Sequence, residues 1–162
     1  MEISENSRVW IYQSNRVLTL EEELNIQLKL NEFTSQWLAH GNKLAALGEI
    51  RHNRFIILSV DENQAGATGC SIDKSVSLLK EIEQQFNLNL FDRFQIAYRD
   101  VDKNIINCNR EEFENLLSDG KINSNTIVFN NLVQTRKELE TNWEISLKNS
   151  WHAQVFEVKK NT

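Results

Sequence analysis

The chain has 162 residues, 40% of them apolar and 25% charged, a composition typical of folded globular proteins rather than fibrous or disordered ones. Its 18 basic and 23 acidic residues give a formal net charge of −5 without a basic cluster, which disfavours nucleic acid as a partner. The amino terminus is polar, and no apolar stretch approaches the roughly 18 residues of a membrane span, so we expect a cytoplasmic protein.

A strand and a helix are predicted in the first forty residues. The aromatic and β-branched run 9–13 predicts a strand. Thr19 and Glu22 have the spacing of a capping box, so a helix is expected to begin after Thr19 and to end near Gly41. Its apolar residues recur at helical intervals: Leu20, Leu24, Leu28, Ile26, Leu30, Phe33 and Trp37.

A β-hairpin is predicted next. Two strand-like runs, 43–51 and 54–60, are joined at His52 and Asn53, and asparagine tolerates the positive φ of a tight turn. Within the second run, residues 55–58 are all apolar, which indicates a strand that is buried on both faces.

A second helix and a fourth strand complete the predicted core. Ser71 is expected to cap the helix, and residues 94–98 to form the strand. The resulting order, βαββαβ, is that of a ferredoxin-like core with an antiparallel sheet and helices on one face. We therefore predict a single α+β domain over 1–162, with this core at about 8–100 and a C-terminal α/β extension at about 101–162.

The extension has weaker signals. Short strands are predicted at 105–106 and 126–129, helices from Asn109 and near Thr135, and a terminal strand at 153–158. Apolar residues at helical spacing are expected to lie on the last helix: Leu139, Trp143 and Leu147. An aromatic cluster of Trp143, Trp151 and His152 belongs to a core more often than to a ligand pocket.

The segment 66–75 offers the strongest candidate for a binding site, because two glycines precede a helix whose first turn has free N–H groups. Such a turn can hold a small anion, with these ligand-binding residues: Gly66, Gly69, Cys70, Ser71, Lys74 and Ser75. Asp73 occupies the place where a P-loop has glycine before its lysine, which disfavours nucleotide hydrolysis. The alternative is a glycine-bearing loop before a well-capped helix.

Cys70 gives an enzymatic alternative, because a helix N-terminus can lower a cysteine pKa and favour the nucleophilic thiolate. Nucleophilic catalysis also needs a base, and none of the three histidines is placed beside Cys70 by the sequence. The histidines, the cysteines and Asp61-Glu62 show no metal-ligand spacing, so we predict no metal site, and we predict no cofactor.

Four segments together resemble a small uncharacterised bacterial family whose members often carry the label "ABC transporter ATPase". They are 9–16, 69–75, Leu90–Arg93 and Ser150–His152, and the resemblance spans most of the chain. The family has no assigned chemistry, so the resemblance implies no catalytic role. The ATPase label conflicts with this sequence, which has no Walker motifs and no LSGGQ-like signature.

The sequence therefore favours a noncatalytic domain that binds a small anionic ligand or a protein partner. A homodimer is a further expectation, because sheets of this kind have exposed edge strands that a second copy could cover. The alternative is a thiol-dependent enzyme with Cys70 as nucleophile.

Overall fold

A computed structural model of the chain describes residues 3–156 and divides into two compact units. Unit 1 covers the described chain up to Asp92 together with Gln134–Lys137. Unit 2 covers Arg93–Val133 and the described residues from Glu138 onward. Among residues 3–156, no helix has both the length and the apolar character needed to cross a membrane.

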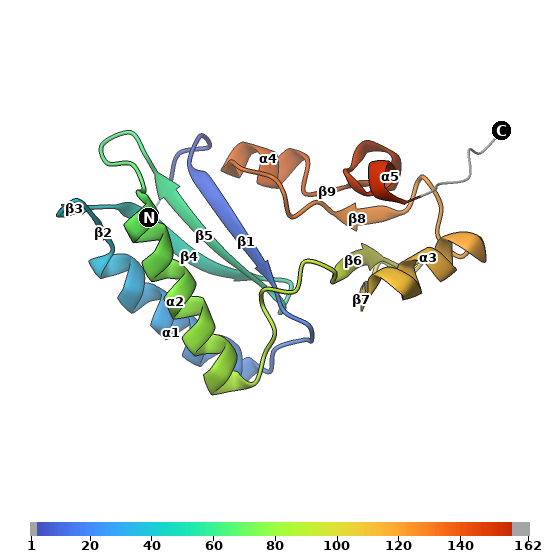
Figure 1. Cartoon of the computed structure of the whole chain (residues 1–162), viewed down its shortest axis with the longest axis horizontal. Helices are drawn as coiled ribbons and strands as arrows, with labels where there is room; N and C mark the ends of the chain where they lie inside the picture. Colours follow the sequence, from blue (N-terminus) through green and yellow to red (C-terminus); the bar gives the residue numbers. More distant parts are fainter. Residues whose placement is uncertain (1–2, 157–162) are drawn as a thin grey trace. The chain divides into compact units, whose positions relative to one another are not determined.

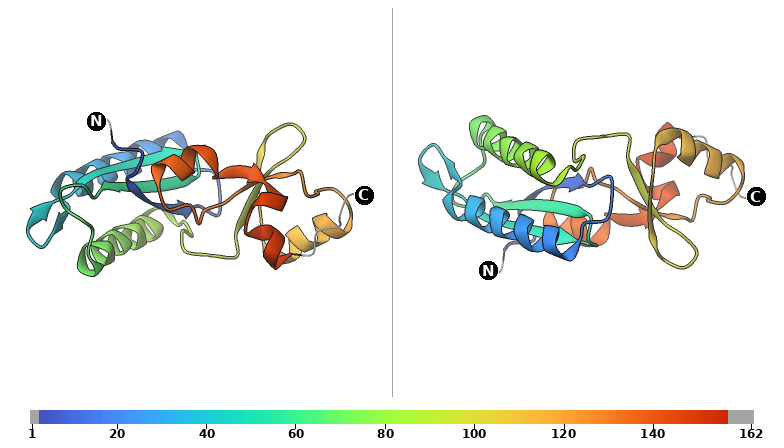
Figure 2. Two further views of the ribbon diagram at one scale, coloured as in Figure 1. Left: turned by 90° about the horizontal axis from the view of Figure 1, so that it is seen from above. Right: turned by 90° about the horizontal axis from the view of Figure 1, so that it is seen from below.

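Unit 1 is a small sheet covered by two helices (Figure 1). Its elements are β1 (Arg8–Gln13), α1 (Leu20–Gln36), β2 (Leu38–Ala39), β3 (Asn42–Lys43), β4 (Ala45–Arg51), β5 (Phe55–Asp61) and α2 (Gly69–Phe86). The three long strands form an antiparallel sheet in the order β1-β5-β4, and the two short strands pair with each other. Both helices lie on one face of the sheet (Figure 2).

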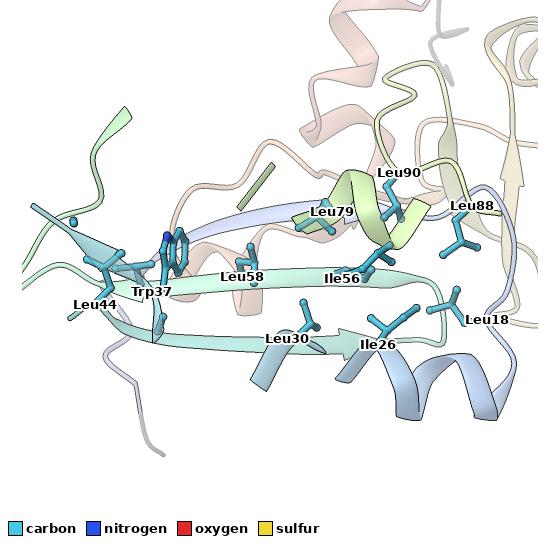
Figure 3. Packing of buried hydrophobic residues seen from close by; sticks show 14 residues of the cluster. Leu18, Ile26, Leu30, Trp37, Leu44, Ile56, Leu58, Leu79, Leu88 and Leu90 are labelled. Atoms are coloured by element: carbon cyan, nitrogen blue, oxygen red, sulfur yellow. The ribbon is translucent and has the colours of Figure 1, made fainter. Parts of the chain in front are cut away.

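The core of unit 1 lies between the helices and the central strand β5 (Figure 3). Because side chains alternate along a strand, Ile56 and Leu58 point toward the helices, where they meet Ile26, Leu30 and Leu79. Residues 55–58 are fully buried, which confirms the predicted strand that is covered on both faces. The all-apolar run therefore reflects a strand at the centre of its sheet.

Two local signals are confirmed. Thr19 Oγ1 accepts a hydrogen bond from the Glu22 amide at 3.1 Å, and Glu22 Oε1 accepts one from the Thr19 amide at 2.9 Å. The hairpin turns at His52 and Asn53, whose φ angles are 53° and 57°. Both features depend on residues within a few positions of one another.

The predicted helix ends need correction. α1 ends at Gln36, because Trp37 is extended, and Gly41 with φ 78° lies in the turn between β2 and β3. α2 begins at Gly69, three residues earlier than expected, with Thr68 as its N-cap. Ser71 is the third helical residue and not the cap.

Unit 2 has a four-stranded antiparallel sheet in the order β7-β6-β8-β9. Its elements are β6 (Ile96–Arg99), β7 (Ile105–Cys108), α3 (Arg110–Ser118), β8 (Ile127–Phe129), β9 (Glu144–Ser146), the 3-10 helix η1 (Leu147–Asn149) and α5 (His152–Val155). α4 (Arg136–Thr141) begins in the Gln134–Lys137 segment of unit 1 and continues in unit 2. Phe113, Val128 and Leu147 are fully buried in the core of this unit.

The α+β class is confirmed, whereas the ferredoxin-like topology is not. The strand expected to complete the first sheet, now β6, pairs with β7 and β8 in a separate sheet, so the sheets number three within residues 3–156. The position beside β1 is taken by the segment Gln134–Lys137, which we call the returning segment. An isolated bridge between Arg8 and Thr135 joins it to β1. The boundary between the units accordingly follows Asp92, whereas the expected boundary between core and extension is near residue 100.

The carboxyl-terminal predictions also need correction. α4 ends at Thr141, so Leu139 lies on it while Trp143 precedes β9 and Leu147 starts η1. All three residues are buried, but they do not share one helix. α5 covers residues 152–155 and so replaces the beginning of the strand expected at 153–158, whose last two residues lie outside the described residues.

Candidate functional site

At the start of α2, where an anion was expected, the Thr68 and Ser71 amides already have hydrogen-bond partners within the chain. Thr68 Oγ1 accepts from the Ser71 amide at 3.2 Å, and Ser71 Oγ accepts from the Thr68 amide at 2.7 Å. The Ser71 hydroxyl also donates to the Thr68 carbonyl, and the Ser71 carbonyl accepts from Trp37 Nε1 at 2.8 Å. Ser71 is buried, and all of these groups have partners that belong to unit 1.

Glu62 places a negative charge in the turn that precedes α2. Its Oε2 accepts a hydrogen bond from the Ala67 amide at 2.8 Å, and a Cβ at Gly66 would lie 3.1 Å from the same oxygen. This carboxylate occupies the position of an anion at the turn and would repel a second one. The geometry therefore gives the predicted anion site no support.

The other predicted ligand residues do not converge on one point. Ser75 is buried, donates to the Ile72 carbonyl at 2.6 Å and hydrogen-bonds Tyr12. Gly66, Gly69, Cys70 and Lys74 are all exposed at the surface. A Cβ at Gly69 would meet no atom within 4 Å, so no close approach of the chain requires that glycine.

Cys70 is an exposed free thiol, and Cys108 is a buried one. Within residues 3–156, no hydrogen bond joins Cys70 to a histidine. Burial raises the pKa of Cys108 to about 12, which leaves its thiol protonated and inert. In the described part of the chain, no group of three metal-ligating side chains comes together.

Unit 2 contains a buried pair that the sequence did not predict, Ser150 and His152. Ser150 Oγ lies 2.7 Å from His152 Nδ1, and the imidazole stacks on Trp151 with ring centroids 3.8 Å apart. Burial lowers the pKa of His152 to about 4, so the ring is neutral at pH 7. Because both partners are buried, the pair belongs to the core and presents no nucleophile to a substrate. Trp143 packs instead against Phe129.

A charged cluster lies on the sheet face of unit 1 that is opposite the helices. Arg136 Nη1 donates to Glu49 Oε1 and to Ser59 Oγ, each at 2.9 Å, and Arg51 lies 3.4 Å from the same carboxylate. The segment carrying Arg136 is also bonded through its backbone to residues near β1, including the Val9 amide. The cluster therefore fastens the returning segment to the sheet, and Arg136 is not a free anion ligand.

The outer side of α1 carries three leucines, one in each of three successive turns, that lie outside the hydrophobic core of unit 1. Leu20, Leu24 and Leu28 are 73%, 61% and 67% exposed, while Ile26 and Leu30 on the inner side are fully buried. We call these three residues the leucine face.

Charges along the leucine face are unevenly distributed. Glu21, Glu22 and Glu23 crowd the first turn of α1, and Lys29 lies in its second half. Glu22 pairs with Arg16 Nη2 at 2.7 Å, and Glu21 and Glu23 are the other acidic groups of this turn. The outer side of α1 thus combines apolar surface with one acidic end.

Comparison with known proteins yields no match to a protein-family model, a curated protein or a solved structure. The resemblance to the bacterial family labelled as transporter ATPases therefore stays a prediction.

Proposed function

We propose that the chain is a noncatalytic protein-interaction domain whose binding surface is the leucine face. The observation that supports this is the exposure of Leu20, Leu24 and Leu28 on three successive turns of one helix. Burying one leucine side chain contributes about 1.5–3 kcal/mol, so leaving three in water is unfavourable unless a partner covers them.

The burial pattern of the helices favours this proposal. α2 exposes polar side chains on its outer side, as a solvent-facing helix normally does: Asp73, Lys74, Ser77, Lys80, Glu81 and Gln84. α1 instead has apolar residues on both sides, since Ile26 and Leu30 fill the core while the leucine face lies outside. A helix that is apolar on two sides normally packs against two neighbours.

The other predicted functions receive less support. Anion binding at the start of α2 would place a second negative charge near the Glu62 carboxylate, which bonds the Ala67 amide in the preceding turn. Catalysis by Cys70 would require a base that no hydrogen bond supplies among residues 3–156. Both stay predictions, as does the cytoplasmic location that we expect.

Photo-crosslinking from the leucine face tests the proposal. Ser35 is exposed and lies seven residues after Leu28, which is two helical turns further along the same side of α1. A photoreactive residue at position 35, introduced in the source cells, is expected to crosslink one defined protein, and Leu24→Glu should abolish that product.

A photoreactive residue at the exposed Gln84 of α2 is the matched control and should give no such product. The proposal fails if position 35 crosslinks nothing, or if its product survives Leu24→Glu. Catalytic turnover that depends on Cys70 would also overturn it, in favour of the enzyme alternative.

A further inference from the structure

The leucine face has the spacing needed to bind a copy of itself. Leu20 and Leu28 lie four residues on either side of Leu24. If two α1 helices cross antiparallel at Leu24, Leu20 of one copy faces Leu28 of the other in both halves of the contact. A twofold axis through Leu24 therefore makes the surface complementary to itself.

The charges agree with the antiparallel direction. Glu21 and Lys29 lie four residues on either side of Asn25, one residue from the same centre. An antiparallel pair brings Glu21 of one copy close to the level of Lys29 of the other, offset by two residues or about 3 Å along the helix axis, twice in each dimer. A parallel pair would instead bring the acidic first turns together, which costs energy.

We propose that the leucine face binds a second copy of this chain, with the two α1 helices antiparallel about Leu24. This inference rests on the proposed function and names its partner. Each face exposes on the order of 400 Å² of apolar surface, and two faces with their polar margins bury about 1,000 Å², the lower limit of specific interfaces. An interface at this lower limit is expected to be weak and to depend on the protein concentration.

The edges of the first sheet are a less suitable route to a dimer. On β4, the Gly48 carbonyl accepts a hydrogen bond at 2.9 Å from Gln27 Nε2 of α1. On β1, the Val9 amide donates at 2.9 Å to the Gln134 carbonyl. On each outer strand, at least one backbone group already has a hydrogen-bond partner within unit 1. These hydrogen bonds hinder the addition of a strand from a second copy.

Sedimentation equilibrium of the whole chain, from about 5 to about 500 μM, covers the range of weak association and tests the inference. The average mass is expected to rise from 18.9 kDa toward twice that value. Leu24→Glu should stay monomeric throughout, with unchanged circular dichroism because Leu24 contributes nothing to the core. Leu132→Glu replaces a leucine that is equally exposed in unit 2, and should dimerise like the unchanged chain.

Charge exchange tests the direction of the helices. Glu21→Lys and Lys29→Glu should each weaken the dimer several-fold, and the double variant should restore it, because every contact is again between opposite charges. Failure of the double variant to restore dimerisation would overturn the antiparallel arrangement.

Two results would overturn the second copy as partner: a monomer at every concentration, or a dimer that persists in Leu24→Glu. The proposed function would survive the first of these if position 35 still crosslinks a different protein in a Leu24-dependent manner. If neither a dimer nor a crosslink forms, both proposals fail.

Discussion

Arg136 Nη1 lies 2.9 Å from Glu49 Oε1, although 87 residues separate the two in sequence. The same nitrogen donates to Ser59 Oγ, and the side chains of Arg136 and Glu49 are only 16% and 24% exposed. This contact holds the segment Gln134–Lys137 against the first sheet, so unit 1 is assembled from two distant parts of the chain.

Arg136→Leu should therefore destabilise the protein by about 1–3 kcal/mol, because Glu49 and Ser59 would lose a half-buried donor. Urea denaturation measures the change. Arg110→Leu is the control, since its pair with Glu114 is about half exposed and should contribute less than about 0.5 kcal/mol. Equal losses in the two variants would show that the Arg136 contact is no more than a surface ion pair.

Gly48 is required by close packing of α1 on β4. A Cβ at this position would lie 2.8 Å from Leu30 Cβ, closer than two such atoms approach, so Gly48→Ala should cost about 1–3 kcal/mol. Gly69→Ala is the comparison, because a Cβ there meets no atom within 4 Å and should change stability by less than about 0.5 kcal/mol. A Gly48→Ala protein as stable as the unchanged chain would contradict the packing described for α1.

Stability should depend on pH through His152. Its pKa is about 4 when folded against 6.5 when unfolded, so the unfolded state binds more protons between these values. The contribution of neutral His152 to the free energy of unfolding is complete above pH 6.5. It is lost progressively as the pH falls toward 4, by about 3 kcal/mol in total.

The measurement is the difference in unfolding free energy between the unchanged chain and His152→Gln, which cannot titrate, from pH 8 to about 4. The subtraction cancels the pH dependence that comes from carboxylates such as Glu22. Its hydrogen bond with Arg16 lowers the pKa of Glu22 to about 2, so this residue changes the stability below pH 4.5. A difference that does not change with pH would show that His152 is not buried as a neutral ring.

The two thiols should differ in reactivity with a disulfide reagent. Cys70 is exposed and should react in the folded protein, whereas Cys108 is buried with its pKa raised to about 12 and should react only after unfolding. One equivalent is expected in buffer and two in urea. In Cys70→Ser none is expected in buffer, and a rapid reaction of that variant would place Cys108 at the surface.

Local features of the fold could be predicted from the sequence because their causes are local. The Thr19–Glu22 capping box and the turn at His52–Asn53 each depend on residues within four positions. The cap of α2 was misplaced by three residues, because Thr68 and Ser71 are both good caps and each bonds the other's amide. The spacing of Leu139, Trp143 and Leu147 suggested a helix that ends at Thr141 in the structure.

Long-range pairing could not be predicted, and this affected both the topology and the candidate site. β6 has the composition of a core strand, but only its pairing with β7 and β8 shows that it belongs to the second sheet and not to the first. α1 has two apolar sides with the same helical period, Ile26–Leu30 and Leu20–Leu28, and the sequence does not say which one faces the sheet. The exposed side, which we propose binds a partner, became visible only with the burial of the other.

Methyl NMR of the leucines is the most direct measurement of the binding surface. We expect the resonances of Leu20, Leu24 and Leu28 to shift as the chain is concentrated or as extract of the source cells is added. Those of Leu132, exposed in unit 2, should stay in place. If the leucine-face methyls are unchanged under both conditions while another surface responds, the leucine face is not the binding site.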